Sequence, residues 1–151
     1  MLVDKLGDLL KSGCNVICHQ TNCQGVMGSG IALQIRTQFP KVYKTFLDSY
    51  KQGKSKLGEI DVVQVEDKYI VNMYSQNKYL PRGVNHTSYD AFRACLRKIK
   101  ERFINERENI TIDFPANIGC GLAGGDWSVV RDIIDVEFKD WRVEIWKFQK
   151  N

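Results

Sequence analysis

No stretch of the sequence approaches the ~20 consecutive apolar residues that a membrane-spanning helix needs, and the opening MLVDKLGDLLKSG lacks the basic and apolar regions of a signal peptide. Dense runs of Lys or Arg are also missing, since 22 Lys+Arg against 18 Asp+Glu give a formal net charge of +4. This charge favours mild attraction to anions such as phosphates and argues against an extended nucleic-acid-binding stripe. We therefore expect a soluble cytoplasmic protein that does not contact a membrane.

Histidine is scarce, occurring only at His19 and His86. Cys18 and Cys23 flank His19 at no spacing typical of zinc, and a second pair of ligands is missing. The number of cysteines is odd, and most lie inside apolar runs, which indicates reduced thiols rather than a disulfide framework. The five are Cys14, Cys18, Cys23, Cys95 and Cys120. The sequence predicts no bound metal and no cofactor.

The 151 residues, 43% of them hydrophobic, suit one domain over residues 1–151 with a single real core. Apolar periodicity separates β-branched runs from amphipathic stretches. It predicts strands in 14–20, 59–76 (two, around a turn at Glu66-Asp67), 109–121 and 141–148, and helices from Ile31 to Pro40 and over 41–51, 86–106 and 127–140. Strands that alternate with helices indicate an α/β fold whose sheet carries helices on both faces.

Two glycine-rich loops follow predicted strands. The first, Gly25-Val26-Met27-Gly28-Ser29-Gly30, leads into a helix near Ile31, and the second spans 119–125. Such loops offer backbone N–H groups and the positive end of a helix dipole to a phosphate, while glycine lets the backbone approach closely. Neither the P-loop nor the dinucleotide-binding glycine pattern is present. Two loops of this kind could hold a diphosphate from both sides, although tight turns alone would also explain the glycines.

The segments TNCQGVMGSGIALQIRTQFP (21–40), NIGCGLAGGDW (117–127) and GDLL (7–10) together resemble the macro domain family. Members of that family bind ADP-ribose on a three-layer α/β/α sandwich with a mixed central sheet. The resemblance runs in order along nearly the whole chain. It is closest to the branch with ADP-ribose 1''-phosphate phosphatases, terminal ADP-ribose protein glycohydrolases, and antitoxins that remove ADP-ribose from DNA.

The resemblance implies roles for individual residues. Asp8 would accept a hydrogen bond from the adenine amino group, with a simple turn role as the alternative. Asn22 would lie beside the distal ribose, and Gln76 near the rim. The residues matching the two loops that enclose the diphosphate and ribose are Gly25, Val26, Met27, Gly28, Ser29, Gly30, Ile31, Ile118, Gly119, Cys120, Gly121 and Leu122.

The same resemblance leaves the chemistry open. The glycohydrolase and antitoxin branches are expected to carry a lysine where this chain has Gln76, and the glycohydrolase branch an aspartate where it has Ala123. Lys78 could replace the lysine if the strand stayed extended, and Asp126 could approach from the second loop, unless it caps the helix at Trp127.

A phosphatase reaction needs an acid or base and donors that stabilise the transferred oxygens. His19 can titrate near neutral pH and matches a histidine of the phosphatase branch, so it is expected beside the distal ribose; a buried structural histidine is the alternative.

Three functions follow from these residues. The first is a hydrolase of ADP-ribose 1''-phosphate that uses His19 and Asp126 as catalytic groups. The second is a glycohydrolase that removes ADP-ribose from protein carboxylates or from DNA. The third is a reader that binds ADP-ribose without chemistry. All three predict a partner that is ADP-ribose or one of its derivatives, including ADP-ribosylated protein or DNA.

Overall fold

The structure of the protein is a computed structural model that describes residues 2–13 and 15–149. Its elements follow in the order β1 (Leu2–Gly7), η1 (Leu9–Lys11), β2 (Val16–Asn22), α1 (Gly30–Gln38), α2 (Pro40–Lys51), β3 (Ile60–Val65), β4 (Lys68–Gln76), α3 (Tyr89–Phe103), η2 (Ile104–Asn109), β5 (Ile112–Pro115), α4 (Trp127–Glu137) and β6 (Val143–Phe148). None of the helices in the described ranges is long and apolar enough to cross a membrane.

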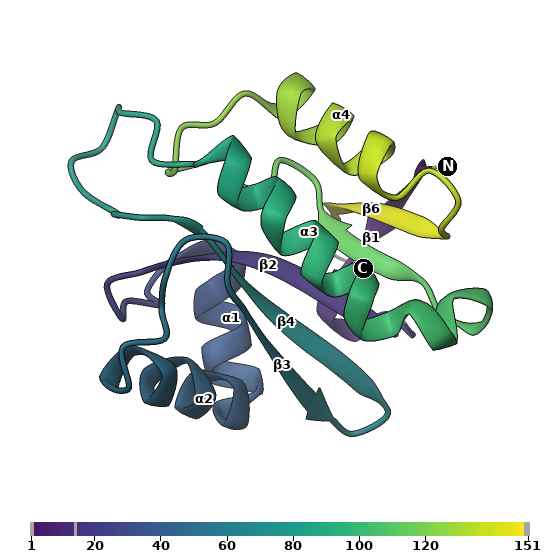
Figure 1. The fold of residues 1–151 in the computed structure, drawn as a ribbon, viewed down its shortest axis with the longest axis horizontal. Helices are drawn as coiled ribbons and strands as arrows, with labels where there is room; N and C mark the ends of the chain where they lie inside the picture. Colours follow the sequence, from purple (N-terminus) through teal and green to yellow (C-terminus); the bar gives the residue numbers. More distant parts are fainter. Residues whose placement is uncertain (1, 14, 150–151) are drawn as a thin grey trace.

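The strands form one sheet in the order β1-β6-β5-β2-β4-β3. All neighbouring strands are parallel except β3, which pairs with β4 in antiparallel register through the turn at Glu66-Asp67. Five strands therefore end at the same edge of the sheet. Helices α1 and α2 lie on one side of the sheet, and α3 and α4 on the other (Figure 1). The expected three-layer α/β/α architecture with a mixed sheet is confirmed.

Two apolar cores fill the spaces between the layers. Successive side chains of β2 point to opposite faces of the sheet. Cys18 therefore packs in the core beneath α3 and α4, and Ile17 in the core beneath α1 and α2. A smaller cluster of Met27, Phe46 and Tyr74 anchors the first glycine loop against α2. The sheet and its helices thus fix both glycine loops at one edge.

Two details differ from the sequence-based expectations, and a third agrees with them. Strand β1 was not predicted, because it is an edge strand whose residues are mostly exposed, without a clear apolar run. The strand expected over 109–121 ends at Pro115, where the chain turns. Pro40 both ends α1 and begins α2, in agreement with the expected pair of helices, because a helix tolerates proline at its first position.

The prediction that the cysteines are reduced thiols can be compared with the structure for four of the five. Cys18, Cys23, Cys95 and Cys120 are free, and Cys14 lies outside the described residues. Within the described residues, no group of three or more His, Cys, Asp and Glu side chains gathers in a way that could hold a metal ion.

Candidate ligand-binding cleft

The carboxyl ends of the five parallel strands meet at one edge of the sheet. They are Gly7 of β1, Asn22 of β2, Gln76 of β4, Pro115 of β5 and Phe148 of β6. In open α/β sheets this edge is where ligands bind, because loops that leave adjacent strands diverge there and leave a crevice.

Asn22 shapes the first glycine loop. Its Oδ1 accepts hydrogen bonds from the N–H groups of Gln24 (3.0 Å) and Val26 (3.3 Å), and its Nδ2 donates to the Val26 carbonyl (2.6 Å). Asn22 lines the cleft, but its side-chain oxygen and nitrogen are already bonded to the loop. Asn22 therefore fixes the conformation of the loop before a ligand binds. Any contact that Asn22 makes with a ligand comes in addition to these hydrogen bonds.

Gly25 and Met27 do not line the cleft, in contrast to the expectation for the whole loop. Gly25 has φ +74°, and a Cβ there would approach the Tyr50 ring to 2.9 Å. Met27 is buried against Phe46 and Tyr74. Both residues hold the back of the loop to α2, while Val26, Gly28, Ser29, Gly30 and Ile31 face the cleft.

The N-terminus of α1 is open toward the cleft. Ser29 is the N-cap residue, but its side chain makes no capping hydrogen bond, in contrast to Ser88 at α3 and Asp126 at α4. The N–H groups of a first helical turn have no intrahelical acceptor. Those of Gly30, Ile31 and Ala32, which all line the cleft, remain available to a bound anion at the positive end of the helix dipole.

The second glycine loop is held by Thr87 and by its own turn. The Thr87 hydroxyl donates to the Gly119 carbonyl (2.6 Å), which also accepts from the N–H of Gly125 (2.9 Å). Gly119 has φ +75°, and a Cβ there would lie 2.9 Å from Gln20 Oε1. Ile118, Gly119, Gly121 and Leu122 of this loop line the cleft.

Cys120 is the exception in this loop, because it lines neither cavity. Its thiol donates to the Ile118 carbonyl at 3.2 Å, and the side chain packs against the core beneath α3 and α4. Burial, aided by the charge of Asp126, raises the pKa of the thiol to about 11. The thiol is therefore protonated at neutral pH and is no nucleophile.

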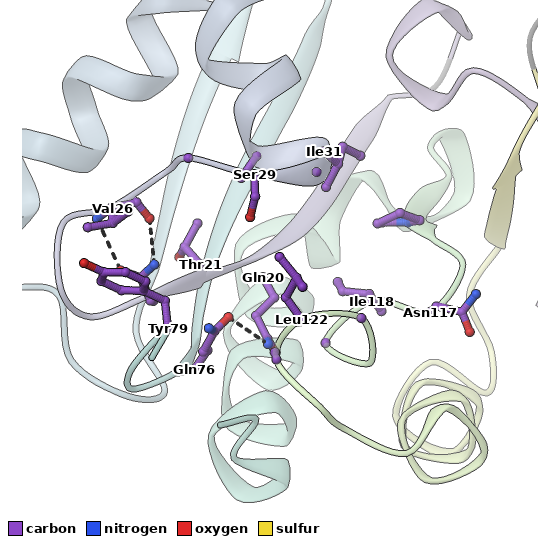
Figure 2. A pocket seen from close by; sticks show the side chains of 18 of the residues that line it. Gln20, Thr21, Val26, Ser29, Ile31, Gln76, Tyr79, Asn117, Ile118 and Leu122 are labelled. Carbon is purple, nitrogen blue, oxygen red and sulfur yellow. Dashed lines mark hydrogen bonds between the residues drawn. The ribbon is translucent and has the colours of Figure 1, made fainter. Parts of the chain in front are cut away.

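The two loops enclose a cleft of about 610 Å³. A second cavity of about 290 Å³ adjoins it and is lined by Asp8, Trp146 and Phe148. The two cavities share Gly30, Ile31, Pro115 and Ala116, so they lie next to one another, and the pair is here called the path. In the view of Figure 2, Val26 and Tyr79 lie at one end of the larger cavity and Asn117 at the other, with Leu122 between them.

His19 does not reach this path, and the position expected for it beside the ligand was wrong. The residue is fully buried, on the same face of β2 as Ile17, which packs beneath α1 and α2. Its Nε2–H donates to Asn72 Oδ1 at 2.6 Å, since Asn72 Nδ2 in turn donates to Asp61 (3.1 Å). Burial lowers the pKa of His19 to about 4, against the opposing influence of Asn72 and Asp61. The imidazole is neutral at physiological pH and belongs to a buried polar network.

Asp126 also lies outside the cleft. Its carboxylate accepts from the N–H (2.9 Å) and the hydroxyl (2.7 Å) of Ser128, so it is the N-cap of α4. These hydrogen bonds lower the pKa of Asp126. The capping alternative therefore describes its geometry, and no contact brings it toward His19.

Gln76 lines the cleft, and its carboxamide is fixed on both sides. Its Nε2 donates to the Lys78 carbonyl (2.7 Å), and its Oε1 accepts from Gln20 Nε2 (3.3 Å), a contact drawn in Figure 2. Strand β4 ends at Gln76, so the extended path that would have aimed Lys78 inward does not exist. Lys78 is exposed and lines neither cavity.

Sequence reasoning missed part of the lining. Unpredicted members are Gln20, Thr21, Ala32, Tyr79, Leu80, Arg82, Pro115, Ala116, Asn117 and Ala123 in the larger cavity, and Gly7, Leu9, Leu10, Gln34, Trp146 and Phe148 in the smaller one. Gln20 had a usable signal, because it is the last residue of the strand predicted over 14–20 and so lies at the edge where the loops leave the sheet. Tyr79, Leu80 and Arg82 had none, because they come from an irregular segment that long-range contacts place.

Fold and site together define an α/β protein with a ligand cleft between two glycine loops at the carboxyl edge of its sheet. A profile of the Macro domain family matches residues 18–134. The chain belongs to the Macro domain family.

Three relatives illustrate what the chain is similar to, and the names of two of them state an activity. The chain is 31% identical over 124 residues to an uncharacterized 17.5 kDa protein of Enterobacteria phage T4, covering 79% of this chain and 77% of the phage protein. It is 30% identical over 129 residues to a DNA ADP-ribosyl glycohydrolase of Mycobacterium tuberculosis, covering 82% of this chain but only 35% of that longer protein. An ADP-ribose 1''-phosphate phosphatase of Scheffersomyces stipitis is 46% identical over 46 residues, or 26% of this chain and 27% of that protein.

Solved structures agree with the fold. The macrodomain of Mycobacterium tuberculosis DarG superposes with a TM-score of 0.82 at 27% sequence identity, covering 97% of both chains.

Proposed function

We propose that this protein binds ADP-ribose along the joined cavities, with the adenine end at Asp8 and the distal ribose at Gln76. One observation carries this proposal: the two cavities meet at Gly30, Ile31, Pro115 and Ala116, so a single elongated ligand can occupy both. The family membership and the names of the relatives support the same ligand.

The middle of the path suits a diphosphate. On one side, the open N-terminus of α1 presents the N–H groups of Gly30 and Ile31. On the other side, the N–H groups of Gly119, Gly121 and Leu122 donate to no acceptor within the described residues. A diphosphate would lie between two sets of backbone donors, which need not reorganise when it binds.

The smaller cavity suits the adenine. Asp8 Oδ1 accepts from the N–H of Leu10 at 3.0 Å, which fixes the carboxylate at the end of β1 and leaves its remaining lone pairs for the adenine amino group. Phe148, 63% exposed, and Trp146 supply aromatic surface beside it. A purine with an exocyclic amino group therefore fits better than one with a carbonyl at the same position.

Hydrolysis of an ADP-ribose adduct is the second candidate function, favoured by the names of the relatives. Among the described residues that line the larger cavity there is no Asp, Glu, His, Lys or Cys. With no such side chain near the distal ribose, the basic oxygens closest to that sugar would be those of the bound diphosphate. Any hydrolysis would then depend on water positioned between the ligand and amides such as that of Gln76.

Calorimetric titration with ADP-ribose and with inosine diphosphate ribose tests the binding proposal. We expect the native protein to prefer the adenine ligand, and Asp8→Asn to reduce that preference, because the amide keeps the bond to Leu10 but offers a weaker acceptor. Asp67→Asn, in the β3–β4 turn, is the matched control and should change neither affinity. Absence of ADP-ribose binding by the native protein would reject the proposal. Incubation of the same sample with ADP-ribose 1''-phosphate and with ADP-ribosylated protein and DNA then decides whether hydrolysis accompanies binding.

A further inference from the structure

Residues 77–87, here called the strap, join β4 to α3 and are tied to both glycine loops. The Cys23 N–H donates to the Asn77 carbonyl (3.3 Å), and the Tyr79 N–H donates to Gln24 Oε1 (3.2 Å). At its other end, the His86 N–H donates to the Ala123 carbonyl at 2.7 Å. The strap therefore bridges the two loops and walls the end of the cleft that lies away from Asp8.

Three strap residues line this end of the cleft: Tyr79, Leu80 and Arg82. Tyr79 is 39% exposed and Leu80 53% exposed, so both leave apolar surface uncovered. Side chains of this kind beside an open cavity can contact a ligand part that extends past the distal ribose. The strap thus provides a contact surface in addition to a wall.

Arg82 is the one ionised side chain among the described residues that line the larger cavity. Within residues 2–13 and 15–149 its guanidinium makes no hydrogen bond or ion pair. Among the lining residues in the described part of the chain, no carboxylate opposes it. An anion that enters at the strap is therefore attracted by a full positive charge and meets no facing negative charge.

The diphosphate does not account for this cation. Backbone donors of both glycine loops already suit the diphosphate, whereas Arg82 belongs to the strap and lines the larger cavity but not the smaller one that suits the adenine. Guanidinium groups bind phosphate oxygens, like carboxylate oxygens, through two parallel N–H bonds. A second anionic group, separate from the diphosphate, matches the position and the chemistry of Arg82.

We propose that Arg82 and the strap form a subsite for a phosphate group that the ligand carries beyond its distal ribose. This inference rests on the proposed ADP-ribose binding and narrows the ligand to phosphate-bearing adducts. A terminal phosphate monoester and a phosphodiester of a nucleic-acid strand share this chemistry. An ester to a protein carboxylate carries no phosphate there and gains nothing from Arg82.

The test compares ADP-ribose with two ligands that carry phosphate beyond its distal ribose. ADP-ribose, ADP-ribose 1''-phosphate and a short ADP-ribosylated DNA oligonucleotide are titrated into the native protein, Arg82→Gln and Lys78→Gln. Lys78 is the matched control, because it is an exposed cation of the same strap that lines neither cavity. If a ligand is turned over, its affinity is measured before turnover by stopped-flow binding.

We expect the native protein to bind at least one phosphate-bearing ligand about tenfold more tightly than ADP-ribose, in line with one charge-assisted contact. Arg82→Gln should remove that advantage and leave ADP-ribose affinity within about twofold, while Lys78→Gln keeps both. For a monoester, whose second pKa is near 6, the advantage should also grow between pH 5 and 7.5. A pH-independent advantage confined to the oligonucleotide identifies the diester as the source.

Equal affinity of the native protein for all three ligands would overturn the subsite while leaving ADP-ribose binding intact. So would an advantage that persists in Arg82→Gln, or an equal loss of ADP-ribose itself, which would place Arg82 on the diphosphate. Failure of the native protein to bind ADP-ribose would instead remove the proposed function on which the subsite rests.

Discussion

Thr87 donates a hydrogen bond from its hydroxyl to the carbonyl of Gly119, at 2.6 Å, and so ties the start of α3 to the second glycine loop. The hydroxyl oxygen of Thr87 also accepts a hydrogen bond from Gln20 Nε2 at 2.9 Å. Gln20 in turn accepts from the Ser75 hydroxyl (2.7 Å) through its Oε1. Polar side chains from β2 and β4 therefore position a loop that is far away in the sequence.

Replacing Thr87 with valine should loosen this loop. The variant keeps the shape of the side chain but removes one of the two hydrogen bonds made by the Gly119 carbonyl and one of the two made by Gln20 Nε2, at a cost of roughly 0.5–1.5 kcal/mol. We expect ADP-ribose affinity to fall about tenfold, since 1.4 kcal/mol of loop ordering corresponds to a factor of 10, as measured by calorimetry.

Thr37→Val is the control, because the Thr37 hydroxyl bonds only the Leu33 carbonyl on the exposed side of α1. It should leave affinity unchanged. Equal affinities for Thr87→Val and the native protein would show that Thr87 does not position the loop for the ligand.

Gly119→Ala tests the close approach of the second loop to Gln20. Alanine at φ +75° is strained by about 1 kcal/mol, and its Cβ would lie 2.9 Å from Gln20 Oε1. The loop or Gln20 must move, so ADP-ribose affinity should fall by more than fivefold as measured by titration, a factor that corresponds to about 1 kcal/mol.

Gly53→Ala is its matched control, because Gly53 has a similar φ of +71° and open space where the Cβ would lie. Both variants should lose stability from backbone strain, but only Gly119→Ala should lose affinity. A parallel loss of affinity in both would attribute the effect to general destabilisation.

The buried His19 predicts a pH dependence of stability. Its pKa is about 4 in the folded protein against an ordinary value of 6.5, so the unfolded chain binds a proton that the folded protein excludes. The contribution of neutral His19 to the free energy of unfolding is fully present above pH 6.5. It is lost as the pH falls toward 4, at roughly 1.4 kcal/mol per pH unit within that window.

Urea unfolding at pH 7.5 and pH 5.0 should therefore show a loss of stability in the native protein that is smaller in His19→Gln. Glutamine retains an N–H donor for Asn72 and does not titrate. Taking the difference between the two proteins cancels the titration of the carboxylates. Equal losses in both would contradict the low pKa of His19.

The fold was largely predictable, because alternating strands and helices and the two glycine loops are local patterns. Parity along β2 does not decide which residues reach the cleft, because Thr21 lines it from the same face of the strand as the buried His19. What separates the two is that Thr21 lies nearer the carboxyl end of β2. The strap could not be predicted: its contacts from Tyr79 to Gln24 and from His86 to Ala123 join residues far apart in sequence. The early end of β5 at Pro115 escaped prediction as well, because the apolar run continues to Ile118 while Asn117, at φ +63°, has already turned the chain.

Asp126 offers the sharpest distinction between a capping role and a catalytic one. Asp126→Asn keeps an oxygen that accepts from the Ser128 N–H and removes the acid, whereas Asp126→Ala removes both. If Asp126 only caps α4, Asp126→Asn should melt close to the melting temperature of the native protein and Asp126→Ala at a lower temperature. ADP-ribose affinity and any turnover should then be unchanged in both variants. A catalytic acid predicts that both variants lose turnover equally, whatever their melting temperatures. Since the carboxylate faces Ser128 outside the cleft, we expect the first pattern in paired thermal melts and turnover assays.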